Sequence, residues 1–261
     1  MEKLKPQFVV NLNFKTQGQG KPLIILHGLF GTLDNWKSIA NQLSAHFQVY
    51  LIDQRNHGKS QHTPDMDLPS MAKDLADFLG QMNLSKAHIM GHSMGGKVAM
   101  QFAFDYPEYL DKLIVLDIAP RAYQPGHLEI LEALKGLPID TLGSRKEAEE
   151  QLLEKIKEPE TVLFLLKNLS RNKQSGFEWK MNLPVIHRDY MKLIDKIHAQ
   201  LPHAGPVLFL KGSRSNYIRE DDVSGIKALF PKTQIETIPN AGHWLHAENP
   251  SELLNQILHF L

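Results

Sequence analysis

Short runs of apolar and β-branched residues recur along this chain, and amphipathic stretches separate them. In the stretch Met71–Met82, for example, Met71, Leu75, Phe78 and Met82 recur at the spacing of one face of a helix. This rhythm is typical of a parallel sheet whose strands are joined by crossover helices. It predicts an α/β protein in which a mostly parallel, twisted sheet carries helices on both faces. The expected strands are Pro22–His27, Phe47–Asp53, Ala87–Gly91, Leu113–Ile118, Pro206–Leu210 and Gln234–Ile238.

Segments near both ends of the chain extend this pattern. Val9–Phe14 alternates between apolar and polar residues and is followed by Gly18 and Gly20, which predicts an antiparallel hairpin that leads into the sheet. The pair Asn249–Pro250 predicts the capped start of a last helix that runs to Leu261.

The rhythm stops between Arg121 and His203, where Leu, Lys and Glu dominate and strand signals nearly vanish. Glycines and prolines divide this segment into short pieces, which predicts a helical insertion rather than a bundle of long helices. A chain of 261 residues is short enough for one hydrophobic core with an inserted piece. The sequence thus predicts a core domain built from residues 1–120 and 204–261, and a helical cap over a cleft built from residues 121–203.

The composition excludes several classes of protein. Lys plus Arg and Asp plus Glu both number 29, so the formal net charge is zero and a nucleic-acid partner is not expected. No apolar run approaches the ~20 residues that span a bilayer, and the N-terminus lacks the pattern of a secretory signal. The chain contains no Cys, which excludes thiol catalysis, iron–sulfur clusters and thiolate zinc sites. We therefore expect a cytoplasmic protein without a membrane span, acting as a monomer or small homo-oligomer.

Gly91–Gly95 spells G-x-S-x-G between an expected strand and an expected helix over Lys97–Phe104. A nucleophile at such a sharp turn needs glycine on either side, because a Cβ there would collide with the neighbouring backbone. The turn projects the side-chain oxygen of Ser93 clear of the sheet, and the helix N-terminus beneath it favours developing negative charge. Ser93 is therefore the candidate nucleophile.

Two nucleotide-binding patterns compete for the same segment. Gly91–Lys97 also spells the G-x-x-x-x-G-K of a phosphate-binding loop, but that loop needs Ser or Thr at the next position to bind magnesium, and Val98 stands there. No G-x-G-x-x-G follows any expected strand, so a dinucleotide-binding fold is not expected either. No nucleotide cofactor is therefore expected.

A second glycine-rich turn, His27–Gly31, follows the first expected parallel strand. An oxyanion hole needs a backbone N–H in a loop beside the nucleophile, and a turn with flanking glycines can supply it. By position we nominate the amides of Leu29 and Met94. Without a nucleophile at Ser93, the same turn is equally well interpreted as a simple end to the strand.

A general base for this serine should come last in chain order, on a loop after the final strand. Ala241–Trp244 contains His243 at that position, and Gly242 lets the loop turn tightly. His246 could pair with His243 in a metal site, but no acidic third ligand and no H-E-x-x-H pattern accompany them, so no metal is expected. The other histidines considered are interpreted as structural: His27, His57, His88 and His92.

On these motifs the chain resembles the α/β-hydrolase superfamily, and within it the YbfF-type esterases. The resemblance covers nearly the whole chain and rests on HGLFG, GHSMGG and AGHW, with more specific matches at Asp53–Gly58, Gly91–Lys97, Leu116–Pro120 and Trp179–Leu183. It implies a serine-dependent carboxylester hydrolase with a helical cap and no cofactor. The implied substrates are small-molecule esters with short to medium acyl groups, and acyl-CoA thioesters are a further candidate class.

The acid that orients the base departs from the common pattern of the superfamily. The resemblance places this acid three residues beyond Gly212, where the chain has Ser215. The acidic run Glu220–Asp222 follows, but it is interpreted as the solvated first turn of a helix. Asp117 ends the strand next to that of the nucleophile. The resemblance implies the same choice, with Ser215 as an added hydrogen-bonding partner of His243.

The expected reaction is acyl transfer to the serine, with the histidine as base, followed by hydrolysis of the acyl-enzyme. The segment 177–183 alternates in polarity, and it either lines the acyl pocket or packs the core of the cap. The same triad could instead catalyse carbon–carbon bond hydrolysis or perhydrolysis, and a hydrolase fold can also bind a ligand without turnover. The candidate substrate contacts are His27, Phe30, Trp179 and Trp244.

Overall fold

The computed structural model describes residues 9–173 and 176–261. Its main sheet has seven strands in the order β1-β3-β2-β4-β5-β8-β9, and among them β1 alone runs antiparallel to its neighbour. The predicted mostly parallel α/β architecture is confirmed. The strands are β1 Phe14–Gln17, β2 Pro22–Leu26, β3 Gln48–Ile52, β4 Ala87–His92, β5 Leu110–Leu116, β8 Val207–Gly212 and β9 Thr233–Ile238.

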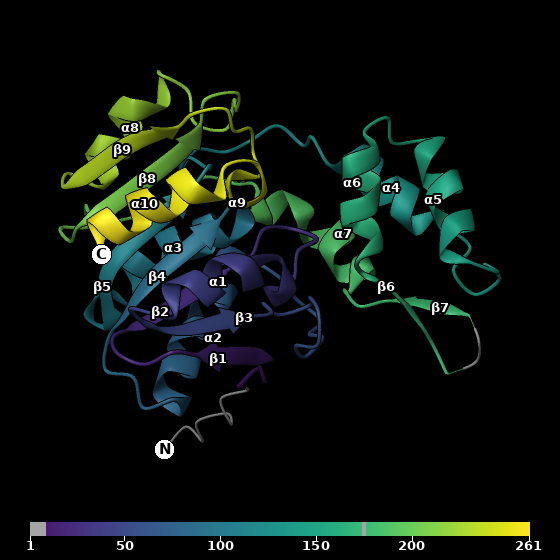
Figure 1. Ribbon diagram of the computed structural model, residues 1–261, viewed down its shortest axis with the longest axis horizontal. Coiled ribbons are helices and arrows are strands. Elements are labelled where there is room, and N and C mark those ends of the chain that lie inside the picture. The colour runs from purple at the N-terminus through teal and green to yellow at the C-terminus, as the bar shows by residue number, and fades with distance from the viewer. Residues whose placement is uncertain (1–8, 174–175) are drawn as a thin grey trace, which may run out of the picture.

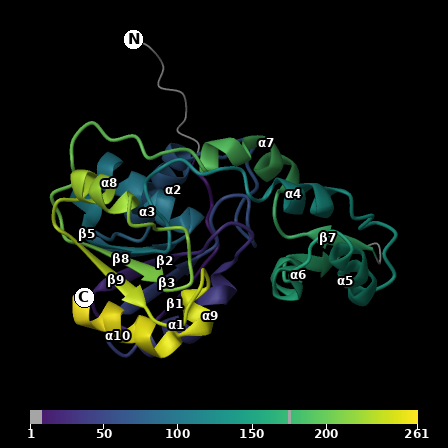
Figure 2. The ribbon, with the colours of Figure 1, turned by 90° about the horizontal axis from the view of Figure 1, so that it is seen from above.

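Helices cover both faces of this sheet. They are η1 Leu33–Trp36, α1 Lys37–Leu43, α2 Leu68–Gln81, α3 Met94–Asp105, η2 Pro107–Tyr109, α8 Asp222–Leu229, α9 Leu245–Glu248 and α10 Pro250–Phe260. Figure 2 shows α2, α3 and α8 on one face and α1, α9 and α10 on the other. Because successive side chains of a strand point to opposite faces, Ile24 and Leu26 of β2 pack toward α2 and α3, whereas Leu23 and Ile25 pack toward α1 and α10. No helix within the described ranges is long and apolar enough to cross a lipid bilayer.

Each strand predicted for the parallel part of the sheet is present, although its ends shift by up to three residues. The prediction for the N-terminal strand is partly wrong. That strand is Phe14–Gln17 rather than Val9–Phe14, and it pairs with β3 instead of forming a hairpin with β2. The reason is that β3 and β4 occupy the two edges of β2, so the outer edge of β3 is the one open to β1. Gly18 and Gly20, both with positive φ, turn the chain between β1 and β2.

The chain between β5 and β8 forms separate elements that lie beside the sheet (Figure 1). We call residues 121–203 the insertion. Most of its regular elements are helices, as predicted, but β6 and β7 form an antiparallel pair that the sequence pattern did not reveal, because three-residue strands are too short to show a period. The division into core and cap domains stays a prediction. The elements are α4 Leu128–Lys135, α5 Arg145–Leu153, α6 Pro159–Leu166, β6 Leu169–Arg171, β7 Phe177–Trp179 and α7 Leu183–Leu193.

The two segments that connect the insertion to the sheet are hydrogen-bonded to each other. The backbone N–H of Tyr123 donates to the carbonyl oxygen of Ile194 at 2.9 Å, and that of Ile197 donates to the carbonyl oxygen of Pro120 at 2.8 Å. The two connecting segments thus lie side by side near the end of β5, and the returning chain then runs on to the start of β8.

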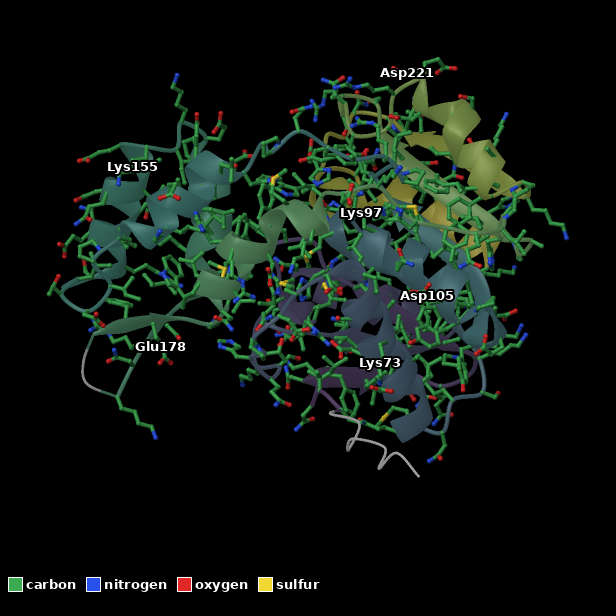
Figure 3. All side chains as sticks on the ribbon, turned by 180° about the vertical axis from the view of Figure 1, so that it is seen from behind. Lys73, Lys97, Asp105, Lys155, Glu178 and Asp221 are labelled. Atoms are coloured by element: carbon green, nitrogen blue, oxygen red, sulfur yellow. The ribbon has the colours of Figure 1, made fainter. Side chains whose placement is uncertain are left out.

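Lys97 of α3 fastens both connecting segments. Its side chain is buried, and Nζ donates to the carbonyl oxygens of Arg121, at 2.9 Å, and of Asp195. Burial lowers the pKa of Lys97 to about 7. Figure 3 labels Lys97 near the junction of the insertion with the sheet, and Lys155 and Glu178 in the outlying part of the insertion. The ammonium group therefore holds the base of the insertion against the helix that starts after Ser93.

Candidate active site

Ser93 stands at the turn between β4 and α3, which is the geometry that the motif predicts. Its φ of 53° and ψ of −118° lie in a region that costs a non-glycine residue about 1–3 kcal/mol. A Cβ added to Gly91 would lie 2.1 Å from the carbonyl oxygen of Gly95, and one added to Gly95 would lie 2.6 Å from that of His27. Both glycines are therefore required by the close approach of the backbone.

Asp117 and His243 meet at the same edge of the sheet. Asp117 follows β5 and is fully buried, and its Oδ2 lies 2.7 Å from Nδ1 of His243, on the loop after β9. His243 and Ser93 line the same cavities. No hydrogen bond joins these two described residues in the structure, and such bonds are often long in a free enzyme and tighten when substrate binds.

The carboxylate of Asp117 accepts two further hydrogen bonds. Ser215 Oγ donates to Oδ2 at 2.5 Å, and Gly212 N donates to Oδ1 at 3.1 Å. Ser215 was expected to bond to His243 and to share the hydrogen-bond network of Asp117; the structure shows the bond to Asp117 and none to His243, because the charged carboxylate is the stronger acceptor. Ser215 therefore acts on His243 through Asp117.

Tyr217 and His92, which no sequence motif assigned to the site, hold His243 in place. The ring of Tyr217 stacks on that of His243, with centroids 3.9 Å apart and planes at 20°. His92 Nε2 donates to the carbonyl oxygen of His243 at 2.8 Å. Burial, helped by the nearby His243, keeps the pKa of His92 well below its usual value, so this ring is neutral. The position of His92 directly before Ser93 was a usable signal, whereas no pattern marked Tyr217.

The two nominated oxyanion amides border Ser93. Met94 is the first residue of α3, directly after the serine. The loop that carries Leu29 passes so close that a Cβ added to Gly28 would lie 3.2 Å from Cβ of Ser93. Neither the Leu29 nor the Met94 amide donates a hydrogen bond to another described residue. Both N–H groups are thus available to a ligand.

Two cavities meet at Ser93, and we call them the wide cavity, of about 610 Å³, and the narrow cavity, of about 280 Å³. The insertion contributes lining residues to both cavities. Tyr190 and Ile194 line the wide cavity, and Phe164 and Leu165 line the narrow one. The residues common to both cavities are Leu29, Ser93, His127, Tyr217 and His243.

Three of the four candidate substrate contacts border the narrow cavity. Phe30 and Trp244 are in its lining. His27 is as well, but its ring is engaged in the loop: Nδ1 lies 2.8 Å from the carbonyl oxygen of Gly28, and Nε2 accepts a hydrogen bond from Gln54 N at 3.0 Å. Burial lowers the pKa of His27. This neutral ring braces the loop, in agreement with the structural interpretation.

Trp179, in contrast, lies outside both cavities. It is on β7, opposite Leu169, and packs against the hydrophobic core of the insertion. The structure thus does not bring Trp179 to either cavity, and its packing favours the alternative interpretation, a place in the core of the insertion. The alternation that suggested a pocket is that of a short strand, with Phe177 buried and Glu178 exposed between the two aromatic residues.

Within residues 9–173 and 176–261, no group of three or more His, Asp or Glu side chains is arranged to hold a metal ion. His246, the candidate partner of His243, packs against Trp36 with ring centroids 4.5 Å apart and planes tilted by 32°. Burial lowers the pKa of His246 to about 4. His57 and His88 are buried in structural positions, and Nδ1 of His88 lies 3.4 Å from Oδ2 of Asp111.

The chain belongs to the α/β hydrolase fold family, which it matches over residues 21–250. It is 40% identical to the sn-1-specific diacylglycerol lipase ABHD11 of Danio rerio over 258 residues, covering 95% of this chain and 80% of that protein. It is 35% identical to esterase YbfF of Escherichia coli, covering 95% of each chain. The solved structure of a marine microorganism esterase is 46% identical, with a TM-score of 0.94 over 97% of this chain and 100% of the other. The family and fold predicted from the motifs are confirmed.

Proposed function

We propose that this chain is a serine-dependent carboxylester hydrolase in which Ser93 is the nucleophile, His243 the general base and Asp117 the acid that orients the base. The chain is an enzyme of the esterase and lipase class to which its relatives belong. The residue assignment rests above all on the 2.7 Å contact between Asp117 Oδ2 and His243 Nδ1, at the sheet edge where the strained Ser93 turn lies. Ser215 supports the acid through its own hydrogen bond.

The reaction begins when His243 Nε2 accepts the proton of Ser93 Oγ as that oxygen attacks the carbonyl carbon of the ester. The amides of Leu29 and Met94 donate hydrogen bonds to the oxyanion that forms. Asp117 keeps a proton on Nδ1 and stabilises the imidazolium. The imidazolium then protonates the departing alcohol or thiol, and the same histidine activates the water that releases the carboxylic acid.

The two cavities suit the two halves of such a substrate. A carbonyl carbon bound at Ser93 has its acyl chain on one side and its alcohol or thiol on the other, and the cavities diverge from this point. The narrow cavity has an apolar lining that includes Phe30, Phe164 and Trp244, which suits a short to medium acyl chain. The wide cavity is more than twice as large and suits the leaving group.

The charge of the wide cavity supports thioesters of coenzyme A as a further substrate class. Within the described lining there is no Asp or Glu. The side chain of Arg219 has no carboxylate within ion-pair distance among the described residues, so its charge is available to a phosphate-bearing thiol. The basic side chains of the lining are Lys97, Arg121, Arg214 and Arg219.

Hydrolysis of p-nitrophenyl esters of increasing acyl length tests the nucleophile. The wild type is expected to turn over and to release a burst of p-nitrophenol as the acyl-enzyme forms, and Ser93→Ala is expected to do neither. Ser224→Ala, at an exposed serine of α8, is the matched control and should behave as wild type. Full activity in Ser93→Ala would reject the assignment. An absence of both burst and turnover in the wild type would favour a ligand-binding protein or another reaction of the triad, such as carbon–carbon bond hydrolysis or perhydrolysis.

A comparison of acyl-CoA with the matching acyl-N-acetylcysteamine tests the thioester proposal, because the two substrates share the reacting bond and differ in phosphate charge. Arg219→Gln is expected to raise KM for the CoA substrate alone. Equal kcat/KM for both substrates in the wild type would mean that the wide cavity does not recognise the phosphates.

A further inference from the structure

Asn168 connects the insertion to the loop His27–Gly31, which carries the amide of Leu29. Asn168 follows α6 and is fully buried. Its Nδ2 donates to the carbonyl oxygen of Phe30 at 2.6 Å, although the two residues lie 138 positions apart in the chain. A weaker contact of 3.4 Å joins Nδ2 to the carbonyl oxygen of Leu165. Because both partners are carbonyl oxygens, which only accept, the orientation of the side-chain amide is determined.

Phe30 depends on this contact more than its neighbours do. Its φ of 61° lies in the left-handed region, which a bulky side chain occupies at an energetic cost. Earlier carbonyl oxygens of the loop are held without the insertion: Gln54 Nε2 donates to that of His27 at 2.6 Å, and Gly31 N donates to that of Gly28 at 3.0 Å. The Phe30 carbonyl accepts its hydrogen bond from the insertion. Without it, only the bond from Gly31 N to Gly28 holds the peptide group between Phe30 and Gly31, and that group can rotate away from its position.

Such a rotation would displace the Leu29 amide. Leu29 lies inside the tight turn Gly28–Gly31. A backbone hydrogen bond between Gly28 and Gly31 closes this turn, so a change at Phe30 also moves Leu29. Asn168 is itself firmly anchored. Its backbone N–H donates to the carbonyl oxygen of Leu165 at 3.0 Å, and its carbonyl oxygen accepts from Lys180 N at 2.8 Å. The side chain therefore transmits the position of the insertion to the loop.

We infer that Asn168 is a positioning residue for the oxyanion hole, and that the hole is complete only when the insertion presents this side chain. The inference rests on the proposed function, because it takes the Leu29 amide as a donor to the oxyanion. A displaced donor weakens the transition state more than the bound substrate, so kcat falls while KM changes little. Removal of one oxyanion donor lowers kcat by about 10²–10³, and we expect a displaced donor to lower it by ~10- to 100-fold.

The test compares Asn168→Ala and Asn168→Leu with Asn182→Ala. Leu has the branched shape of Asn but no hydrogen-bond donor, so it keeps the test valid if the smaller Ala unfolds the protein. Asn182 also belongs to the insertion, and its Nδ2 donates to Asn56 Oδ1 at 3.0 Å and to the carbonyl oxygen of Thr63 at 3.2 Å. Asn182 is the matched control, because the same truncation removes hydrogen bonds between the insertion and the rest of the protein but none to the loop His27–Gly31.

The readouts are kcat and KM for a p-nitrophenyl ester, and the inhibition constant of a trifluoromethyl ketone with the same acyl chain, whose adduct with the serine carries an oxyanion. Both Asn168 variants are expected to lose ~10- to 100-fold in kcat and in inhibitor affinity, with KM within about threefold of wild type, while Asn182→Ala keeps all three values. Wild-type kcat and inhibitor affinity in a folded Asn168 variant would overturn the inference, and so would equal losses in Asn182→Ala. If wild-type turnover does not depend on Ser93, the proposed function fails instead.

Discussion

Replacement of Asp117 by Asn is expected to abolish most turnover, because the amide cannot make the same hydrogen bonds as the carboxylate. The carboxylate accepts from His243 Nδ1, Ser215 Oγ and Gly212 N, whereas an amide has one oxygen and one NH₂ group for the same three contacts. The Gly212 N–H is a fixed donor, so the amide oxygen must remain at that position. The NH₂ group then faces His243 and forces Nδ1 to accept, which moves the ring proton to Nε2.

A proton on Nε2 prevents His243 from taking the proton of Ser93, and the imidazolium also loses its charged partner. The same exchange in a serine protease lowers kcat by about 10⁴, which corresponds to ~5 kcal/mol of barrier. Ser215→Ala removes one neutral donor but leaves the charge of Asp117 in place. Its expected cost is about tenfold in kcat, or ~1.4 kcal/mol. The two variants should therefore differ by roughly three orders of magnitude.

Steady-state hydrolysis of a p-nitrophenyl ester measures both variants, with near-ultraviolet circular dichroism as the check on folding. Ser215→Asp in the Asp117→Asn background supplies a carboxylate at the alternative position and is expected to restore part of the lost kcat. The assignment of the acid would be refuted if Asp117→Asn stayed near wild type while replacement of an acid within Glu220–Asp222 abolished turnover.

Phe164→Ala enlarges the narrow cavity and should shift the preference in kcat/KM toward longer acyl esters by about tenfold. Trp179→Ala should leave the chain-length preference unchanged. The reverse result would contradict the assignment of the acyl site. Burial lowers the pKa of His57 to about 3, and those of His127 and His246 to about 4, from 6.5. The unfolded chain therefore binds more protons than the folded one between pH 6.5 and about 4. The free energy of unfolding should fall as pH falls through this window, by about 1.4 kcal/mol per pH unit for each histidine. Urea midpoints at about pH 7.5 and about pH 5 measure the effect, and equal midpoints would speak against it.

The parallel strands and the Ser93 turn could be predicted because their signals are local. A strand shows itself in a few consecutive residues, and the glycines that allow the turn are direct neighbours of the serine. The contacts that hold the site together are not local. His92 meets a carbonyl oxygen 151 positions away, and Asn168 one 138 positions away. Such pairs depend on the completed sheet and on the place of the insertion, so a single sequence gives no pattern for them.

The acid of the site illustrates how topology can replace a missing motif. Because β5 and β8 are neighbours in the sheet, the residues that follow them converge, and the side chains of Asp117 and Ser215 meet at 2.5 Å. Either position could present a carboxylate to His243. Two carboxylates so close would repel each other and raise the pKa of one of them, so one acid with a neutral hydroxyl donor beside it is the stable arrangement. Once the order of the strands is known, the presence of Ser215 rather than a carboxylate after β8 is therefore an argument that Asp117, after β5, is the acid of the site.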